Sequence, residues 1–377
     1  MRLTTTLPDD PALPGLSAIR AVGLARAIPA LGLGDGPIRL TLYGYTPGER
    51  ATLEARVGQR RFAVKIYAED PASEAALYQA LGTAGLAGDT GVRVPPLLAW
   101  ERDLRLLVLG WLKGPTAEQL FMGGQGARAG ELAARWFERA ANLRVNLGRP
   151  LGAARMMLKA GKWVGRLGAA DPELGTAAQD LLETLARTQP QEGACYLVHG
   201  TLYARHIFDL GDGPGVIDWQ RFGQGPLELD AGMFLATITR LALRHERLAG
   251  EGARAEKAFR AWTRRVLDEH ALVWHRAAAL LRLACKPLGP TEAAGLGPDD
   301  RRAQELAMAR ALLDEAAGPL AQAACPRPIV PAKSRASFIR RRSALELMLQ
   351  ALSTRPATPA ELDEIRRLLD ETNGGTA

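Results

Sequence analysis

Hydrophobic and polar residues alternate most regularly between positions 37 and 67, which is the pattern of strands with one buried face. Three segments show it, namely IRLTLYGY from Ile38, ATLEARVG from Ala51 and RRFAVKIY from Arg60. The turn-forming sequences Thr46-Pro47-Gly48 and Gly58-Gln59 separate them. The pattern predicts an antiparallel meander of three short strands.

The periodicity changes to that of a helix directly after this meander. The segment PASEAALYQALG begins at Pro71 and has Ala75, Leu77 and Leu81 on one side, which predicts a helix with proline near its start. A segment VRVPPLLAW follows, and the next segment, RDLRLLVLGWL, is expected to supply two more strand pieces before Leu112.

From Gly114 onward the chain is mainly helical in pattern. Helical spacing connects apolar residues at Leu132, Trp136, Ala140, Leu143 and Leu147, and again between Ala231 and Leu243. Only residues 196–222 interrupt this half, with strand-loop-strand character. We therefore expect an α+β fold of two lobes, a strand-rich lobe over residues 1–112 and a helical lobe over residues 113–325 that contains the hairpin.

Residues 326–377 form a basic C-terminal extension. The segment SRASFIRRRS contains four arginines in eight residues, and Thr358-Pro359-Ala360-Glu361 is a capping box that predicts a short final helix ending at Leu369. The arginines have two interpretations. They would hold the protein near anionic lipid at the inner face of the cell membrane, or they form a solvated helix face.

Composition narrows the class of protein. The 377 residues are 47% hydrophobic and 24% charged, which excludes a disordered chain, a collagen-like repeat and a coiled-coil rod. No apolar run approaches the roughly 18 residues of a membrane span. The first twenty residues contain Asp9, Asp10 and three prolines, and so lack the apolar core of a signal peptide. A cytoplasmic protein is expected.

Charge and cysteine content add little chemistry. The net charge of +7 permits contact with nucleotides, nucleic acid or acidic lipid. Because 41 of the cations are arginine and only 7 are lysine, the excess resembles the codon bias of a GC-rich genome, and no nucleic-acid partner is expected. Cys195, Cys285 and Cys325 form no CxxC pair, and each is expected to be a small buried hydrophobe.

Lys65 is the first candidate for chemistry. It lies among Val64, Ile66 and Tyr67 at the end of the meander, where an unpaired ammonium group would be costly to bury. Glu74 follows nine residues later on the predicted helix and could pair with it. An ammonium group oriented by a carboxylate is what a nucleotide-phosphate site requires. The alternative is an exposed lysine and a solvated glutamate.

A second cluster lies in the predicted hairpin, and it resembles a known motif. Aminoglycoside and choline kinases, which are protein-kinase-like phosphotransferases, carry H-G-D-L-x-x-x-N-I followed by a hydrophobic strand and I-D-W or I-D-F. The matching residues here are His199-Gly200-Thr201-Leu202-Tyr203, His206-Ile207 and Val216-Ile217-Asp218-Trp219. Within the loop, Tyr203, His206 and Phe208 are more similar to the lipopolysaccharide core (Kdo and heptose) kinases. The resemblance covers roughly residues 37–240.

The resemblance implies a protein-kinase-like fold, bound ATP and a divalent metal. Asp218 would bind Mg²⁺ that bridges the nucleotide phosphates, with the capping of a turn as its alternative role. His206 would be a second metal ligand, better suited to Mn²⁺ than to Mg²⁺, or an ordinary hydrogen-bonding residue. His199 would brace the catalytic loop, and Asp230 matches a structural aspartate of the aminoglycoside kinases.

Other positions follow from their place in the motif order. Gly44, in the segment from Tyr43 to Gly48, occupies the position of the loop that covers the phosphates. Gly110 and Leu112 occupy the hinge, where backbone groups would bind adenine. Two further aspartates, at the far turn of the hairpin, are expected to be solvated. The tryptophans of the helical lobe would line an acceptor pocket or fill a core. The two aspartates are Asp209 and Asp212. The tryptophans are Trp163, Trp262 and Trp274.

Thr201 departs from the family pattern, which has an aspartate there to accept the proton of the acceptor hydroxyl. A threonine hydroxyl cannot act as a general base near neutral pH. Two functions remain open. The first is a phosphotransferase with an atypical loop that phosphorylates a hydroxyl of a small molecule, glycolipid or lipid. The second is a pseudokinase that binds nucleotide or a partner without turnover.

Overall fold

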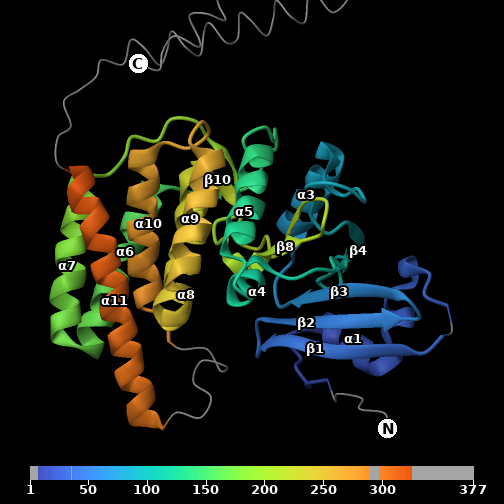
Figure 1. Ribbon diagram of the computed structural model, residues 1–377. Coiled ribbons are helices and arrows are strands. Elements are labelled where there is room, and N and C mark those ends of the chain that lie inside the picture. Colours follow the sequence, from blue (N-terminus) through green and yellow to red (C-terminus); the bar gives the residue numbers. More distant parts are fainter. Residues whose placement is uncertain (1–6, 35, 288–296, 325–377) are drawn as a thin grey trace, which may run out of the picture. The chain divides into compact units, whose positions relative to one another are not determined.

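The protein is described by a computed structural model over residues 7–34, 36–287 and 297–324. These described residues belong to one compact unit. Its strands lie mostly in the first third of the chain and its helices in the remainder (Figure 1), so the expected α+β class is confirmed. Cys325, the arginine-rich segment and the expected final helix lie outside the described residues.

Five strands form an antiparallel sheet in the order β1-β2-β3-β5-β4. They are β1 Ile38–Thr46, β2 Arg50–Val57, β3 Arg60–Tyr67, β4 Leu97–Glu101 and β5 Leu106–Gly110. The predicted meander is confirmed. The prediction of two strand pieces within residues 102–112 is wrong, because residues 102–105 form the turn and β4 comes from the preceding segment.

Two N-terminal helices support the sheet, and the sequence analysis placed no helix there. They are α1 Pro14–Val22 and α2 Leu24–Ala27. Leu16 and Ile19 of α1 share one core with Leu53, Val64 and Ile66 of the sheet. The predicted helix after β3 is α3 Ala72–Leu81. Its buried Leu77 and Tyr78 belong to a different core, which continues into the helical lobe.

The helical lobe consists of long helices packed side by side (Figure 1). They are α4 Ala117–Met122, α5 Gly126–Ala140, α6 Ala153–Ala170, α7 Pro172–Arg187, α8 Leu227–Arg244, α9 Ala249–Thr263, α10 Glu269–Ala284 and α11 Pro298–Ala324. The helical spacing predicted as far as Leu147 is wrong beyond α5, because that helix ends at Ala140 and Leu143 is buried without being helical.

Four short strands build the hairpin region. They are β7 Tyr196–Val198, β8 Ile207–Asp209, β9 Pro214–Val216 and β10 Gly223–Gly225. β8 and β9 pair as a hairpin, whereas β7 pairs with β10, which also runs parallel to β6 Arg149–Pro150. The sequence pattern predicts that the last hairpin strand ends at Asp218, whereas β9 ends two residues earlier.

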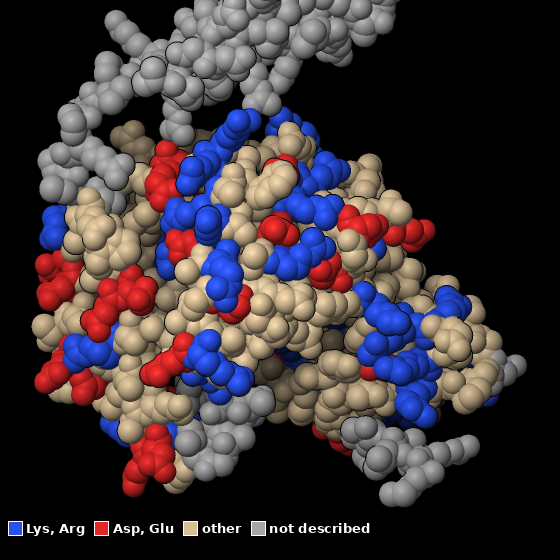
Figure 2. All heavy atoms as spheres, in the orientation of Figure 1, with Lys and Arg blue, Asp and Glu red and all other residues tan. Residues whose placement is uncertain are grey.

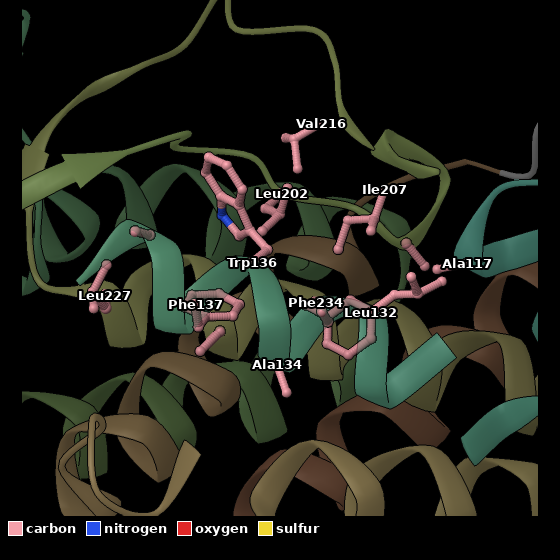
Figure 3. Close-up of a cluster of buried hydrophobic side chains, with 14 of the residues drawn as sticks. Ala117, Leu132, Ala134, Trp136, Phe137, Leu202, Ile207, Val216, Leu227 and Phe234 are labelled. Carbon is pink, nitrogen blue, oxygen red and sulfur yellow. The ribbon is translucent and has the colours of Figure 1, made fainter. Parts of the chain in front are cut away.

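Helix α5 supports this region from below. Leu132 and Trp136 of α5 belong to the same buried cluster as Leu202, Ile207 and Val216 (Figure 3). All five side chains are at most 2% exposed. The loop that carries the kinase-like motif is therefore fixed on the core of the helical lobe.

Of the two aspartates at the far turn that were expected to be solvated, the expectation is confirmed for Asp212, which is exposed, and is wrong for Asp209. Asp209 accepts two hydrogen bonds from Arg128 of α5, at 2.7 and 2.8 Å, and its side chain is only 14% exposed. Asp212 is more exposed but accepts hydrogen bonds from the Arg93 guanidinium and from the Gly91 amide. Both carboxylates therefore connect the hairpin to neighbouring segments through hydrogen bonds.

Several remaining expectations concern single side chains and the surface. Cys195 is exposed and Cys285 is half-buried, so the expectation of buried cysteines is wrong for both. Trp274 is fully buried in a core, whereas Trp262 is exposed. Within the described residues, no helix combines the length and apolarity needed to cross a bilayer. On the face in Figure 2, basic and acidic side chains are interspersed over the helices, and basic ones predominate over the sheet.

Candidate active site

Strand β3 and helix α3 place the Lys65 ammonium against the Glu74 carboxylate. Nζ of Lys65 lies 2.7 Å from Oε1 of Glu74, and the Tyr67 hydroxyl donates to Oε2 of the same carboxylate at 2.7 Å. Both side chains of the ion pair are under 10% exposed. Burial is the largest single influence and lowers the pKa of Lys65, but Glu74, the two neighbouring tyrosines and Asp218 together outweigh it and hold the pKa well above its usual range. The lysine is therefore charged.

Asp218 reaches the same ammonium group from the hairpin region. Its Oδ1 lies 3.3 Å from Nζ of Lys65, although 153 residues separate the two in sequence. Burial raises the pKa of Asp218, but Lys65 and other nearby groups lower it to about 2. The residue has a φ of 71°, in the left-handed region that most side chains avoid. Lys65 thus joins the strand-rich lobe to the hairpin of the helical lobe.

His206 stands beside Asp218 on the other side. Its Nε2 lies 3.6 Å from Oδ2 of Asp218, and its Nδ1 has no hydrogen-bond partner among the described residues. Burial, with the adjacent His199, lowers the pKa of His206 to about 2, so the imidazole is neutral. A carboxylate and a neutral imidazole are both possible metal ligands. The described residues contain no group of three or more such side chains that could hold a metal alone.

His199 and Asp230 fix the start of the catalytic loop. The His199 and Gly200 amides donate to the Asp230 carboxylate, and Nε2 of His199 donates to the Ile217 carbonyl at 2.8 Å. Gly200 has a φ of 79°, and a Cβ there would lie 2.2 Å from the Arg221 carbonyl oxygen, so only glycine fits. Burial raises the pKa of Asp230 to about 7. Through these contacts His199 connects the loop to the segment that precedes Asp218.

Thr201 follows directly in this loop and is 8% exposed. It is not among the residues that line the cavity described below. Among the described residues that do line it, Asp218 is the only carboxylate. Position 201 therefore offers a hydroxyl and no base, and among the described residues Asp218 is the one carboxylate at the wall of that cavity.

A cavity of about 550 Å³ lies between the sheet and the hairpin region. It contains Lys65, His206 and Asp218 on one side and mainly apolar residues elsewhere. Three positions predicted to bind nucleotide, Gly44, Gly110 and Leu112, line it, whereas Glu74, His199 and Thr201 do not. The site residues predicted from the sequence therefore divide into a group at the cavity wall and a group behind it.

Two details of the cavity differ from the sequence expectations. Tyr43 and Gly44 lie within strand β1, which continues to Thr46, so the expected covering loop is reduced to a turn at residues 47–49. The Gly110 amide donates to the Pro96 carbonyl at 2.8 Å and is not free for a ligand. Hinge contacts with a base would therefore involve other backbone groups, such as those of Leu112.

Asp10 is a residue near the site that sequence reasoning missed. Its Oδ2 accepts hydrogen bonds from the Gly48 amide at 2.8 Å and from the Tyr45 hydroxyl at 3.0 Å. The segment before the sheet is thereby tied to the turn between β1 and β2. Nothing in the spacing of Asp10 indicates this contact, because the partners lie more than thirty residues away.

Comparison with known families agrees with this geometry. A model of the phosphotransferase enzyme family named APH matches residues 49–270, which is more than half of the chain. The protein belongs to this family of phosphotransferases. The matched region runs from β2 into the start of α10 and includes Lys65, Glu74 and Asp218. No match is found among curated proteins.

Solved structures share the fold at low sequence identity. The microcompartment-associated aminopropanol kinase is 16% identical, with a TM-score of 0.54 over 80% of this chain and 99% of that one. A choline/ethanolamine kinase family protein from Mesorhizobium loti is 17% identical, with a TM-score of 0.50 over 81% and 97%. An amicoumacin kinase in complex with AMP-PNP and Ca²⁺ is 13% identical, with a TM-score of 0.51 over 74% and 89%. The protein has the two-lobed, protein-kinase-like α+β fold of these enzymes.

Proposed function

We propose that this protein transfers the γ-phosphoryl group of ATP to a hydroxyl group of a small molecule, glycolipid or lipid, with the help of a divalent metal. The main support is the Lys65 ammonium, which lies between Glu74 and Asp218 at the wall of a nucleotide-sized cavity. The resemblance of Tyr203 and His206 to lipopolysaccharide core kinases supports a glycolipid among the acceptors. An enzyme that consumes ATP would act in the cytoplasm.

The proposal assigns the charged residues to the phosphates. Lys65 would bind phosphate oxygens, and Glu74 would orient its ammonium group. Asp218 and His206 would hold Mg²⁺ or Mn²⁺, and the phosphates and water would complete the coordination, as Mg²⁺ prefers in such sites. The neutral Nε2 of His206, 3.6 Å from Oδ2 of Asp218, and the low pKa of Asp218 fit this donor set. The amicoumacin kinase complex, with AMP-PNP and Ca²⁺, supports a nucleotide and a divalent ion together.

The remaining cavity residues would bind the nucleoside. The wall around Gly110 and Leu112 is apolar and suits a base, while Gly44 of β1 leaves space for the phosphates to approach the backbone. A bound metal would neutralise charge on the phosphates. Phosphoryl transfer has a loose transition state and depends mainly on positioning and charge neutralisation, so it can proceed without a strong base at Thr201.

Nucleotide binding tests these assignments. ATP with Mg²⁺ should raise the melting temperature of the wild type, and saturation at about 100 times Kd corresponds to about 2.7 kcal/mol of stabilisation. Lys65→Met should weaken ATP binding with or without metal. Asp218→Asn should remove the additional effect of the metal and leave part of the ATP effect.

Two exposed positions provide matched controls, namely Lys257→Met on α9 and Asp103→Asn in the β4–β5 turn. Both should respond to ATP and metal like the wild type. Equal shifts in the wild type, Lys65→Met and Asp218→Asn would show that these residues do not bind the nucleotide and its metal.

Thr201 supports a second candidate function, a pseudokinase that binds nucleotide without transfer. The two functions differ in the response to Thr201→Asp. In a slow kinase, an aspartate should preserve or speed transfer, because a positioned base contributes about 10²- to 10⁴-fold. Labelled ATP and a cell extract of sugars and lipids provide the assay, with Asp218→Asn as the inactive reference. Absence of transfer by both the wild type and Thr201→Asp, with ATP bound, would favour the pseudokinase.

A further inference from the structure

A second cavity lies on the other side of the catalytic loop. It has a volume of about 230 Å³ and is lined from α6, α8, α10 and the loop itself. Gly200, which precedes Thr201, is part of its wall, whereas Arg205 and His206 line the larger cavity. The loop from Gly200 to His206 therefore separates the proposed nucleotide cavity from this one. An acceptor hydroxyl would have to approach this loop.

The second cavity is strongly cationic. Arg155 and Lys159 of α6 and Arg282 of α10 line it, and among the described residues no carboxylate does. None of the three forms an ion pair within the described part of the chain, and Nε of Arg155 is buried without a hydrogen-bond partner. Burial, and then the like charges of Arg155 and other arginines, lower the pKa of Lys159. The cations thus repel one another and lack a counter-charge.

Two acidic residues lie beside wall residues of this cavity, Glu192 next to Gly152 and Asp230 next to Gly200, and both already accept hydrogen bonds. Glu192 accepts hydrogen bonds from the Ala153 amide at the start of α6 and lies 3.1 Å from Nε2 of His275. Asp230 accepts from the amides of the catalytic loop. Lys286, next to the cavity, donates to the Tyr203 hydroxyl, which carries no charge to offset it when protonated. No carboxylate of the described residues is therefore left to neutralise this cavity, which favours a bound anion.

We propose that this cavity binds a phosphate group of the acceptor, so that the substrate is a phosphate ester with a free hydroxyl group. This inference rests on the proposed kinase function. The guanidinium groups of Arg155 and Arg282 are suited to paired hydrogen bonds with phosphate oxygens, and Lys159 adds a third charge. Apolar side chains of the same wall, including Met156, Trp163 and Met233, would contact the carbon skeleton.

The charge of this wall also excludes a class of acceptors. A cationic acceptor, such as an amino alcohol or an aminoglycoside, would be repelled by three neighbouring cations.

In the transfer, the hydroxyl oxygen forms a bond to the γ-phosphorus, the bond from that phosphorus to the β–γ bridging oxygen breaks, and ADP leaves. The hydroxyl proton passes to an oxygen of the transferred phosphoryl group, since Thr201 cannot accept it.

Direct anion binding is the first test, and it does not depend on turnover. Inorganic phosphate is titrated into the protein, with saturating ADP and Mg²⁺ in the nucleotide cavity, and the melting temperature is followed. The wild type should be stabilised, and the double variant Arg155→Gln/Arg282→Gln should lose this effect. Lys162→Gln, an exposed position on the same helix, should behave like the wild type. Equal phosphate stabilisation in the double variant and the wild type would overturn the proposal.

Acceptor pairs provide the second test and separate soluble from lipid sources of phosphate. Transfer from labelled ATP is compared between glucose and glucose 6-phosphate, between glycerol and glycerol 3-phosphate, and between phosphatidylcholine vesicles that contain diacylglycerol and those that contain phosphatidylglycerol. We expect kcat/KM to be at least about tenfold higher for the phosphorylated or anionic member of each pair. A tenfold preference corresponds to the lower end of the free-energy range that hydrogen bonds to charged groups contribute. Arg282→Gln should raise KM for that acceptor and leave KM for ATP unchanged.

The outcomes separate this inference from the proposed function. A preference for the unphosphorylated members, with transfer still dependent on Asp218, would overturn the phosphate site and leave the kinase function intact. Phosphate binding that requires Arg155 and Arg282, in a protein that does not bind ATP, would support the anion site and contradict the kinase function. If no tested acceptor is phosphorylated, the phosphate titration decides.

Discussion

Two histidines of the catalytic loop are buried in their neutral form. The rings of His199 and His206 stack with centroids 5.2 Å apart, and both residues are at most 4% exposed. Burial is the main cause that lowers the pKa of each, in His206 to about 2. An unfolded histidine has a pKa of about 6.5. Below that pH the unfolded chain therefore takes up protons that the folded protein does not.

The sign of the resulting pH dependence follows from this difference. As pH falls below 6.5, each neutral histidine lowers the free energy of unfolding by up to about 1.4 kcal/mol per pH unit. In His206→Gln one such group is absent. The stability of the wild type relative to this variant should therefore decrease between pH 6.5 and pH 4.5, as measured by urea denaturation with a chelator present. A constant difference for His206→Gln would contradict the assignment.

Single residues also show what the sequence can and cannot predict about the site. The spacing of Lys65 and Glu74 was enough to predict that they pair. Asp218 could be placed beside them only because it belongs to the I-D-W motif of similar kinases. The hydrogen bond from Tyr67 to Glu74 and the contact of Asp10 with Gly48 have no sequence signature. They arise from tertiary packing, which brings together side chains whose types and spacing are ordinary.

At the scale of elements, the helical lobe depends on close helix packing. Helices α5 and α9 approach so closely that a Cβ at Gly130 would lie 2.1 Å from the Ala255 carbonyl oxygen. By contrast, a Cβ at Gly161 of α6 would meet no atom within 4 Å. Both glycines are in helix interiors, where glycine is less favourable than alanine by roughly 0.5–1 kcal/mol. The same substitution therefore has opposite effects at the two positions.

Gly130→Ala should destabilise the protein by about 1–3 kcal/mol, because the added methyl group forces α5 away from α9. Gly161→Ala should stabilise it by roughly 0.5–1 kcal/mol. Chemical denaturation of both variants measures the difference. Since α5 also carries Leu132 and Trp136 beneath the hairpin, Gly130→Ala should lower nucleotide affinity too. Stabilisation by Gly130→Ala would show that the helix packing relaxes without cost.

Elements were predictable where the pattern is regular and local. The meander and α3 follow from alternation and helical spacing. The end of α5 was missed because Leu143 keeps its helical spacing but is buried in a loop, so the apolar pattern reports burial and not the helix itself. Helix α1 was missed because its nine residues are too few to establish a helical period, although its apolar positions cover the sheet.

At the scale of the whole molecule, the N-terminal segment and the proposed nucleotide cavity are connected. Asp10 is 7% exposed and accepts from Gly48, Tyr45 and, through its other oxygen, the Ala12 amide at 3.1 Å. The hydrogen bond from Gly48 is the largest cause that lowers the pKa of Asp10. Strand β1, which supplies Gly44 to the cavity, ends immediately before this turn.

Asp10→Ala should therefore raise KM for ATP by several-fold, because hydrogen bonds to a charged group contribute about 1.5–3 kcal/mol and part of that orders the turn. Asp10→Asn, which keeps an acceptor oxygen, should have a smaller effect. The exposed Asp9→Ala variant should leave KM unchanged. Steady-state kinetics or ATP titration measures the effect, and an unchanged KM in Asp10→Ala would show that the turn is ordered without this contact.

The left-handed backbone at Asp218 restricts which residues suit that position. Glycine, asparagine and aspartate adopt this conformation most readily, so the fold would accept an uncharged asparagine there. The Lys65 ammonium does not need a second counter-charge either, because Glu74 already pairs with it at 2.7 Å. Neither the backbone nor the buried lysine therefore requires a negative charge at residue 218, whereas the proposed divalent metal would.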